Sequence, residues 1–269
     1  MRTLLRLVRP RVVPRIAPLI AVVLLLAFTA TSSRAANPDA LWQIVHDRCV
    51  PDQQANGSPA PCALVDLTNG YAVLKDIVGA TQFLLIATAK VTGIEDPAIL
   101  APLAPNYFAA AWQSHDRVEQ LAGTMLPREA LGLAINSAHG RTQNQLHIHI
   151  DCLRPDVAAA VRAHAASVSS TWAPFPVKLL GHPYLARRLA SEDLSDANPF
   201  RLLADSVPGA RDDMGQWTLV AVGATIKGTG FGAGEPGFVL LADHVDAATG
   251  DRASGEELQD HACAIKSPG

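Results

Sequence analysis

The chain has 269 residues, of which 49% are hydrophobic and 17% are charged, and its formal net charge is −3. Six of the 22 basic residues and none of the 25 acidic residues lie in the first 36 positions. The remainder therefore carries 16 basic and 25 acidic residues, with a net charge near −9. Such a domain is poorly suited to general nucleic-acid binding, which depends on clustered positive charge.

The first 36 residues have the pattern of a targeting segment. Arginines precede an uncharged run from Ile16 to Ser33, and Ser33-Arg34-Ala35 forms a small-x-small cleavage site. We expect a signal peptide or a signal anchor over residues 1–36; the sequence leaves both open. In either case residues 37–269 are expected to be exported as one periplasmic domain, and contact with the inner membrane is expected through the N-terminal segment.

The four cysteines are predicted to form two disulfides, because an even number in an exported chain favours them. Cys49 and Cys62 flank a short loop and are expected to pair, which leaves Cys152 for Cys263. The second bridge would pin the C-terminus to the end of a central strand. A metal site is the rival interpretation, but no C-x-x-C spacing supports it.

In chain order, the patterns predict elements of both kinds. The first half reads as a helix over 41–48, a β-hairpin over 63–76 with an Asn69-Gly70 turn, a strand over 82–90, an amphipathic helix over 107–125 and a strand over 131–137. The second half reads as a helix over 155–167, a helix from Asn198 to about Asp205, strands over 216–226 and 237–243 separated by a glycine-rich loop, and a helix over 254–261 that begins with a capping box.

This order predicts an α+β domain built on an antiparallel sheet with flanking helices. A hairpin, a strand ending in LLAD and a helix recur in the second half, which suggests an internal duplication. The later copy lacks a His-x-His sequence, so it would be degenerate.

The candidate site lies on the stretch QLHIHIDC, residues 145–152, which alternates strictly between polar and apolar residues. A β-strand sends alternate side chains to opposite faces, so Gln145, His147, His149 and Asp151 share one face. The other face is apolar. The polar turn His139-Gly140-Arg141-Thr142 delivers the chain into this strand, and together they form a plausible phosphate-binding surface.

His-x-His on a strand has three interpretations. The imidazoles can be satisfied by backbone partners, as buried histidines often are. They can be metal ligands if Asp151, His139 or a distant histidine supplies a third donor. Alternatively, one imidazole can be a nucleophile beside the second, as in known phosphoryl-transfer sites.

The stretch GRTQNQLHIHI resembles the signature of the histidine-triad superfamily. Asn136, Gly140, Thr142, His147 and His149 match that signature in type and position, which implies a HIT-like fold. Arg141 stands where glutamine is usual, and Gln145 stands where the first histidine is usual.

INSAHGRTQNQLHIHIDCLRPDV, GHPYLARRL, NPFRLLAD and QDHACAI together resemble the CDP-diacylglycerol pyrophosphatase family, a membrane-anchored bacterial branch of that superfamily. The similarity runs from about Leu41 to the C-terminus. It implies a hydrolase that converts CDP-diacylglycerol to CMP and phosphatidate through a nucleotidyl-histidine intermediate, with no metal or other cofactor.

The resemblance also implies roles. His147 would be the nucleophile and His149 would hydrogen-bond a phosphate oxygen. Further substrate contacts are expected from Asn136, Arg141, Thr142, Gln145 and Arg154; for Arg154, a plain surface arginine is the rival interpretation. Two other functions stay open, namely an exported hydrolase of soluble (di)nucleotides and a non-enzymatic periplasmic protein that binds a metal or a nucleotide.

Overall fold

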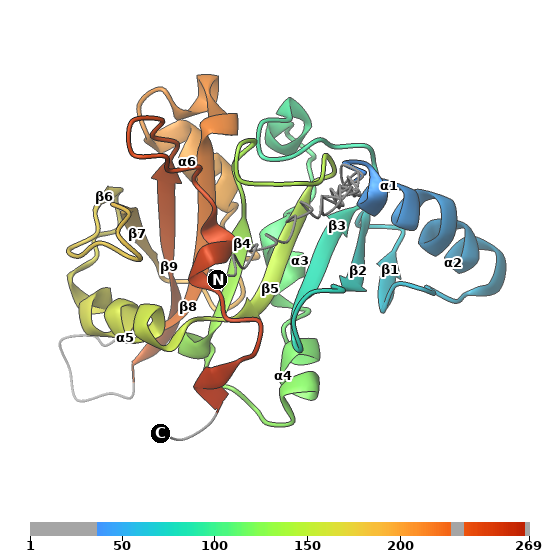
Figure 1. Cartoon of the computed structure of the whole chain (residues 1–269), viewed down its shortest axis with the longest axis horizontal. Coiled ribbons are helices and arrows are strands. Elements are labelled where there is room, and N and C mark those ends of the chain that lie inside the picture. Colours follow the sequence, from blue (N-terminus) through green and yellow to red (C-terminus); the bar gives the residue numbers. More distant parts are fainter. Residues whose placement is uncertain (1–36, 227–233, 267–269) are drawn as a thin grey trace, which may run out of the picture. The chain divides into compact units, whose positions relative to one another are not determined.

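A computed structural model describes residues 37–226 and 234–266 of the chain. The predicted targeting segment and most of the glycine-rich loop lie outside these ranges. Within them the fold is α+β, as predicted, with a nine-stranded sheet whose neighbouring strands are all antiparallel (Figure 1). No helix in the described ranges is long and apolar enough to cross a membrane.

The strands do not lie in sequence order. They are β1 (Leu64–Asp66), β2 (Tyr71–Lys75), β3 (Phe83–Ala87), β4 (Leu131–Ile135), β5 (His147–Cys152), β6 (Ala173–Pro174), β7 (Leu185–Leu189), β8 (Trp217–Ile226) and β9 (Glu235–His244). Their order across the sheet is β1-β2-β3-β5-β4-β8-β9-β7-β6. The strand that carries the two histidines therefore lies inside the sheet, between β3 and β4.

The helices cover both faces of the sheet. They are α1 (Ala40–Ile44), α2 (Val50–Asn56), α3 (Tyr107–Trp112), α4 (Asp116–Ala122), α5 (Pro155–His164) and α6 (Pro199–Ser206). A π-helical segment, Val45–Cys49, joins α1 to α2, so the predicted first helix continues as far as Asn56. It ends where Gly57 adopts a left-handed conformation, which costs glycine little.

The alternation of β5 separates a core face from a site face. Ile148 and Ile150 are fully buried in the main hydrophobic cluster with residues of α3 and α6. On the opposite face, α1 and α2 cover Ile86 and Leu84 of β3, while α5 covers the part of the sheet formed by β8 and β9. His149 pairs with Leu84 of β3 and with Ala134 of β4. The histidines thus lie on this face of the sheet, between the part covered by α1 and α2 and the part covered by α5.

The single helix predicted over residues 107–125 is wrong, because the chain forms two helices, α3 and α4. At the break, the N–H groups of Ser114 and His115 donate to carbonyls three residues back instead of four. The Ser114 hydroxyl also donates to the Ala110 carbonyl at 3.0 Å. Such side-chain bonds compete with the helical ladder, which turns the chain before α4 begins.

The predicted helix over residues 254–261 is also wrong. Only a 3₁₀ turn forms, over Gly255–Leu258. The Ser254 hydroxyl donates to the Asn136 side chain at 3.3 Å, and the Gly255 N–H donates to the Thr218 hydroxyl at 2.8 Å. The hydroxyl and N–H groups that would cap a helix therefore bind this segment to Asn136, just after β4, and to Thr218 of β8. We call residues 252–263 the strap.

Both predicted disulfides are confirmed. Cys49 pairs with Cys62, 13 residues away, and Cys152 pairs with Cys263 across 111 residues. The first joins the end of the π-helical segment to the residues just before the β1–β2 hairpin. The second fixes the end of the strap to the end of β5. Strands β6 and β7 were not predicted from the sequence.

Candidate active site

His147 and His149 lie side by side near the middle of the sheet. Their ring centroids are 4.9 Å apart and their planes meet at 68°. Both rings are buried, yet both line a pocket of about 310 Å³ between α1, the end of β2 and the turn that precedes β5. The shared face that the strand pattern predicts therefore opens into a cavity that can hold a ligand.

The tautomer of His147 follows from its contact with the backbone. Its Nδ1 lies 2.7 Å from the carbonyl oxygen of Gln145. A carbonyl oxygen can only accept, so Nδ1 donates and Nε2 keeps its lone pair. Burial lowers the pKa of His147 below its usual value of 6.5. The ring is therefore neutral at pH 7, with an available nucleophilic nitrogen.

His149 has the opposite tautomer, which Gln82 sets. The Gln82 Nε2 lies 2.6 Å from His149 Nδ1 and 3.2 Å from Glu256 Oε1. The carboxylate only accepts, so the NH₂ group of the amide must point this way, and His149 Nδ1 accepts its second hydrogen. The ring proton is thereby placed on Nε2, which is buried and has no hydrogen-bond partner within residues 37–226 and 234–266.

His149 is neutral as well. Burial lowers its pKa most strongly, and the positive charge of His261 adds to this shift, against the opposing effect of Glu256. The pocket thus contains an imidazole nitrogen with a free lone pair beside an imidazole N–H that lacks an acceptor.

Glu256, from the strap, holds these groups together. One of its carboxylate oxygens faces Gln82 and His149, and the other accepts from the Asn136 side chain at 3.1 Å. The side-chain oxygen of Asn136 in turn accepts a hydrogen bond from the backbone N–H of Glu256 at 3.1 Å. Burial by itself raises the pKa of Glu256, but the hydrogen bond from His261 and the other polar contacts outweigh it, so the net pKa is lowered and the group is ionised.

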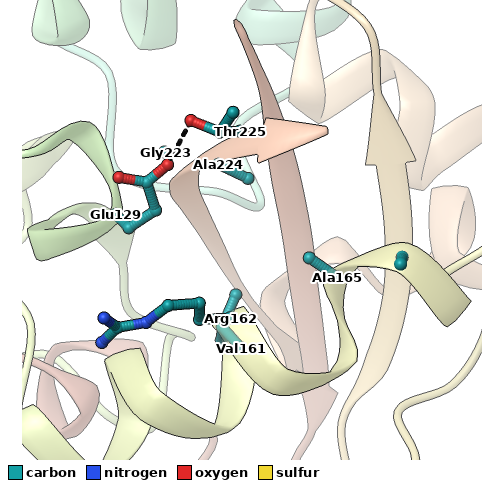
Figure 2. Close-up of a pocket in the computed structure, with 8 residues that line it drawn as sticks. Glu129, Val161, Arg162, Ala165, Gly223, Ala224 and Thr225 are labelled. Carbon is teal, nitrogen blue, oxygen red and sulfur yellow. Dashed lines mark hydrogen bonds between the residues drawn. The ribbon is translucent and has the colours of Figure 1, made fainter. Parts of the chain in front are cut away.

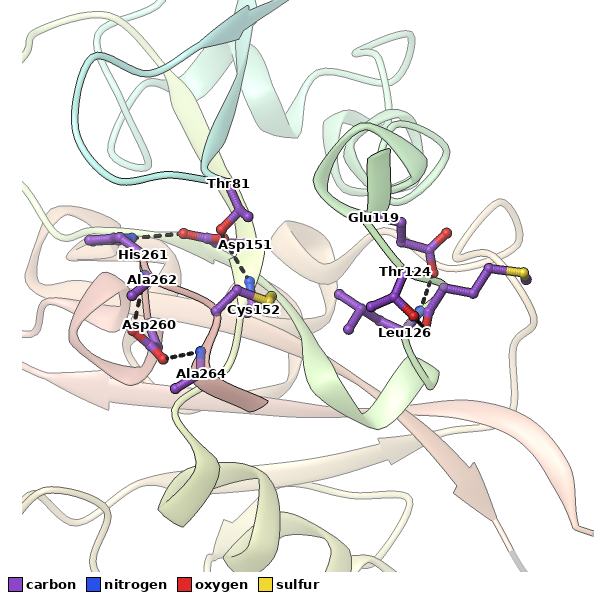
Figure 3. Close-up of a disulfide and its surroundings, with 12 residues drawn as sticks. Thr81, Glu119, Thr124, Leu126, Asp151, Cys152, Asp260, His261, Ala262 and Ala264 are labelled. Atoms are coloured by element: carbon purple, nitrogen blue, oxygen red, sulfur yellow. Dashed lines mark hydrogen bonds and ion pairs between the residues drawn. A yellow bond between two sulfur atoms is a disulfide. The ribbon is translucent and has the colours of Figure 1, made fainter. Parts of the chain in front are cut away.

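His261 carries a positive charge between two carboxylates. Its Nδ1 lies 2.8 Å from Asp151 and its Nε2 lies 3.5 Å from Glu256. The hydrogen bond to Asp151, followed by that to Glu256, raises the pKa of His261 to about 10. Figure 3 shows His261 and Asp151 facing one another, with Thr81 donating to Asp151 at 2.6 Å. A chain of contacts thus runs from Asp151 through His261 and Glu256 to His149.

The other residues predicted for the site occupy different places. Arg141 lines the pocket, but its guanidinium is engaged by Glu95 through two bonds of 2.7 and 2.5 Å. Thr142 is exposed at the rim. Gln145 is fully buried, and its amide donates to backbone carbonyls of Ala87 and Ala89.

Arg154 lies beyond the far end of β5, at the N-terminus of α5. Its guanidinium pairs with Asp156 at 3.2 Å, and its side chain is 43% exposed. It is not among the residues that line the pocket. Of the sequence-predicted residues, the structure therefore brings Asn136, Arg141, Thr142, His147 and His149 together around one cavity.

Four residues of the site were not predicted from the sequence. They are Lys75, Gln82, Glu256 and His261. For His261 a signal was available, because the predicted Cys152–Cys263 bridge brings the residues before Cys263 close to the end of β5. Lys75 reaches the pocket from β2, and its amino group donates to the carbonyls of Asp76 and Gly79 at 2.7 and 3.0 Å. One of its three N–H groups remains for a ligand.

The pocket also has an apolar side. Side chains from α1, from β2 and β3 and from the turn after β2 line it, namely Leu41, Ile44, Leu74, Ile77, Val78 and Leu84. Ile77 is 99% exposed and Val78 is 54% exposed, so this side continues to the molecular surface. Polar side chains, among them both histidines, and an apolar side that reaches the surface thus share one cavity.

A separate hollow of about 250 Å³ lies between α5 and the end of β8 (Figure 2). Among the described residues, Arg162 and Glu129 line it, and Glu129 accepts a hydrogen bond from Thr225. No described histidine lines this hollow.

Comparison with known proteins agrees with the resemblance in the motif. The family model described as CDP-diacylglycerol pyrophosphatase matches residues 36–267. A CDP-diacylglycerol pyrophosphatase from Yersinia pestis is 44% identical over 247 residues, which cover 92% of each chain. The chain belongs to the CDP-diacylglycerol pyrophosphatase family.

Proposed function

We propose that this protein hydrolyses CDP-diacylglycerol to CMP and phosphatidate, and that His147 forms a nucleotidyl intermediate during the reaction. The observation that carries the proposal is the pair of tautomers in the pocket. His147 offers an unprotonated Nε2, and the neighbouring His149 offers an N–H that lacks an acceptor in the described part of the chain. Family membership supplies the substrate.

In the first step, the lone pair of His147 Nε2 attacks the phosphorus of the cytidylyl group. The N–P bond forms while the bond from this phosphorus to the bridging oxygen breaks, and phosphatidate leaves with the electron pair. Phosphatidate is a good leaving group, so this step needs little help from a general acid. In the second step, water attacks the same phosphorus, the N–P bond breaks, CMP leaves and the proton from water passes to solvent.

The surrounding groups favour the transition state. His149 donates its Nε2–H to a non-bridging phosphate oxygen, where negative charge grows. The positive charge that develops on His147 is stabilised by the Gln145 carbonyl at Nδ1 and by the negative charge of Glu256. Among the described residues that line the pocket, Lys75 is the cation available to the diphosphate, since Arg141 is already paired with Glu95.

The apolar side of the pocket suits the diacylglycerol part of the substrate. Apolar residues gain about 25 cal/mol for each Å² removed from water. A soluble dinucleotide would leave this wall and the exposed Ile77 without a role. We therefore place the cytidine diphosphate against the histidines and the lipid against Leu41, Ile44 and Ile77.

We infer that the sheet is a duplicated HIT-like sheet. Outward from its centre, the first half runs β4-β5-β3 and the second half runs β8-β9-β7. If the first residue of β3 is matched to the first residue of β7, their cross-strand partners Ile150 and Ala242 also match. His147 and His149 then correspond to Val239 and Leu241, and Asp151 corresponds to Asp243. The second half would have lost the nucleophile and kept the acid.

We also propose that residues 1–36 direct the chain to the inner membrane and that the catalytic domain lies in the periplasm. Two disulfides support an oxidising compartment. Retention of the N-terminal segment would hold the domain close to its lipid substrate.

The test follows CMP release by the full chain from CDP-diacylglycerol in mixed micelles with excess EDTA. We expect steady release by the wild type and a loss of about 10⁴-fold or more in His147→Ala, because no other group replaces the nucleophile. His46→Ala serves as a control, since His46 is an exposed histidine on the segment that follows α1. Substrate labelled in the cytidylyl phosphate should leave label on His147 after rapid acid quenching.

Three outcomes would contradict the proposal. Normal turnover by His147→Ala would remove the nucleophile assignment. Release that EDTA abolishes would indicate a metal-dependent reaction. Preferential cleavage of soluble nucleotides in a competition assay would change the substrate.

A further inference from the structure

A second cluster of ligand-type side chains lies in the other half of the sheet. It consists of His182 in the turn before β7, Asp243 at the end of β9 and Asp251 just before the strap. One donor atom from each residue lies within 4.8 Å of the other two. In the proposed duplication, Asp243 corresponds to Asp151 of the catalytic half.

Both carboxyl groups are buried, and that of Asp243 is incompletely satisfied. Asp243 is 5% exposed and Asp251 is 6% exposed. One oxygen of Asp251 accepts from the Ala253 N–H at 2.8 Å and the other contacts His182 Nδ1. One oxygen of Asp243 accepts from the His244 N–H at 2.8 Å, whereas Oδ2 is buried and has no hydrogen-bond partner among the described residues.

This arrangement leaves one buried carboxylate oxygen, Asp243 Oδ2, without a partner among the described residues and beside a second buried acid. A buried polar oxygen without a partner is costly, and a second acidic side chain beside it makes the cost larger. A divalent cation between the three side chains would give this oxygen a partner.

We propose that His182, Asp243 and Asp251 bind a divalent transition-metal ion of the zinc type. One imidazole nitrogen and two carboxylate oxygens form a ligand set that suits Zn²⁺, while Ca²⁺ and Mg²⁺ prefer oxygen ligands alone. Ligands around tetrahedral zinc lie roughly 3.4 Å apart, so the His182–Asp251 contact would open slightly and the wider separations, which reach up to 4.8 Å, would close. His182 can move to do so, because it lies in a turn and its side chain is 28% exposed.

The surroundings of His182 support a ligand role. With Nδ1 toward the two carboxylates, its Nε2 lies 3.8 Å from the Glu257 carboxylate. Metal-binding histidines usually direct their second nitrogen to such an acceptor, which fixes the ring. The partial exposure of His182 also gives an ion a path from solvent.

The ion would have a structural role. Strand β9 lies three positions from β5 in the sheet, or roughly 14 Å at the usual strand spacing, so the ion would not touch substrate at His147. Asp251 accepts from Ala253 at the start of the strap. The ion would therefore fasten β7, β9 and the base of the strap that carries Glu256.

The test uses the full chain, stripped with EDTA and dialysed, and titrates it with Zn²⁺ alone in a calorimeter. We expect one equivalent to bind and the melting temperature to rise with zinc. Asp243→Asn keeps the shape of the side chain but removes a ligand charge, and it should bind zinc at least tenfold more weakly, with no rise in melting temperature. His147→Ala should still bind one equivalent, which separates this cluster from the catalytic histidines.

Zinc binding that is equal in wild type and Asp243→Asn would overturn the proposal. So would an absence of binding, which would mean that the two carboxylates share a proton. If Asp243→Asn does not fold, wild type loaded with Co²⁺ decides the matter. X-ray absorption should show a single imidazole among oxygen ligands, and a site with two imidazoles would place the metal elsewhere.

Discussion

His147 can act as a nucleophile only while its imidazole is neutral. Its backbone partner at Nδ1 favours the protonated ring, but burial has the larger effect and lowers the pKa. His149 depends on burial in the same way and receives its tautomer from Gln82. Glu256 orients Gln82, so in the proposed mechanism a residue that touches no reacting atom sets the proton position of His149.

The lowered pKa of His147 predicts the acid side of the pH profile. The folded ring stays neutral below pH 6.5, where an unperturbed histidine would become protonated and lose its lone pair. We therefore expect kcat/KM for CMP release to stay level as the pH falls through 6.5 and to decline only at lower pH. The profile should be measured between pH 4 and 8 in buffers of constant ionic strength.

An inflection at or above pH 6.5 would contradict this prediction. Gln82→Ala provides a check on the tautomer argument, because it leaves His147 unchanged. It should reduce kcat by about 10²-fold, the typical effect of one misplaced donor, without moving the inflection by much.

At the scale of elements, the strap connects catalysis to the disulfide. Glu256 and His261 both lie on this segment, and Cys263 ties its end to β5. The strap has little regular structure, and the bridge Leu153–Gln259 and side-chain bonds hold it against the sheet. Its position therefore depends on tertiary contacts and on the Cys152–Cys263 bond.

The two disulfides should consequently differ in their effects. In the chain-entropy model, opening a loop of 111 residues costs about 5 kcal/mol of unfolding free energy and opening one of 13 residues costs about 3 kcal/mol. Cys152→Ala/Cys263→Ala should lose more stability in urea unfolding than Cys49→Ala/Cys62→Ala. Its kcat should also be lower than that of the wild type at a temperature where the variant is still folded, because the positions of His261 and Glu256 are then less constrained. Equal kcat values in the two double variants would show that the strap holds its place without the bond.

At the scale of the whole molecule, local patterns predicted much of the fold. The alternation of QLHIHIDC placed the histidines on one face, and the Asn69-Gly70 turn and both cysteine pairs are as expected. Strand β7 was not predicted, because its two consecutive arginines interrupt the alternation of polar and apolar residues expected of a strand. Glu256 and His261 lie more than 100 residues beyond His149 in the sequence, so no spacing rule connects them to it. The strap resembles a capped helix in sequence, but contacts with Asn136 and Thr218 decide its conformation.

The course of the pocket from the surface to the sheet indicates how a lipid substrate could reach a buried histidine. Ile77 and Val78 form the exposed rim of the apolar side of the pocket. In the proposed mode of binding, the diacylglycerol part remains partly in the membrane while the diphosphate reaches His147. Ile77→Ser should raise KM for CDP-diacylglycerol in micelles by about tenfold, roughly the 1.4 kcal/mol that such a contact supplies, and should change kcat little. Leu103→Ser is the matched control, because Leu103 is 96% exposed but does not line the pocket. With a short-chain, monomeric substrate the two variants should behave alike. Equal KM values for both variants in micelles would mean that the lipid enters elsewhere.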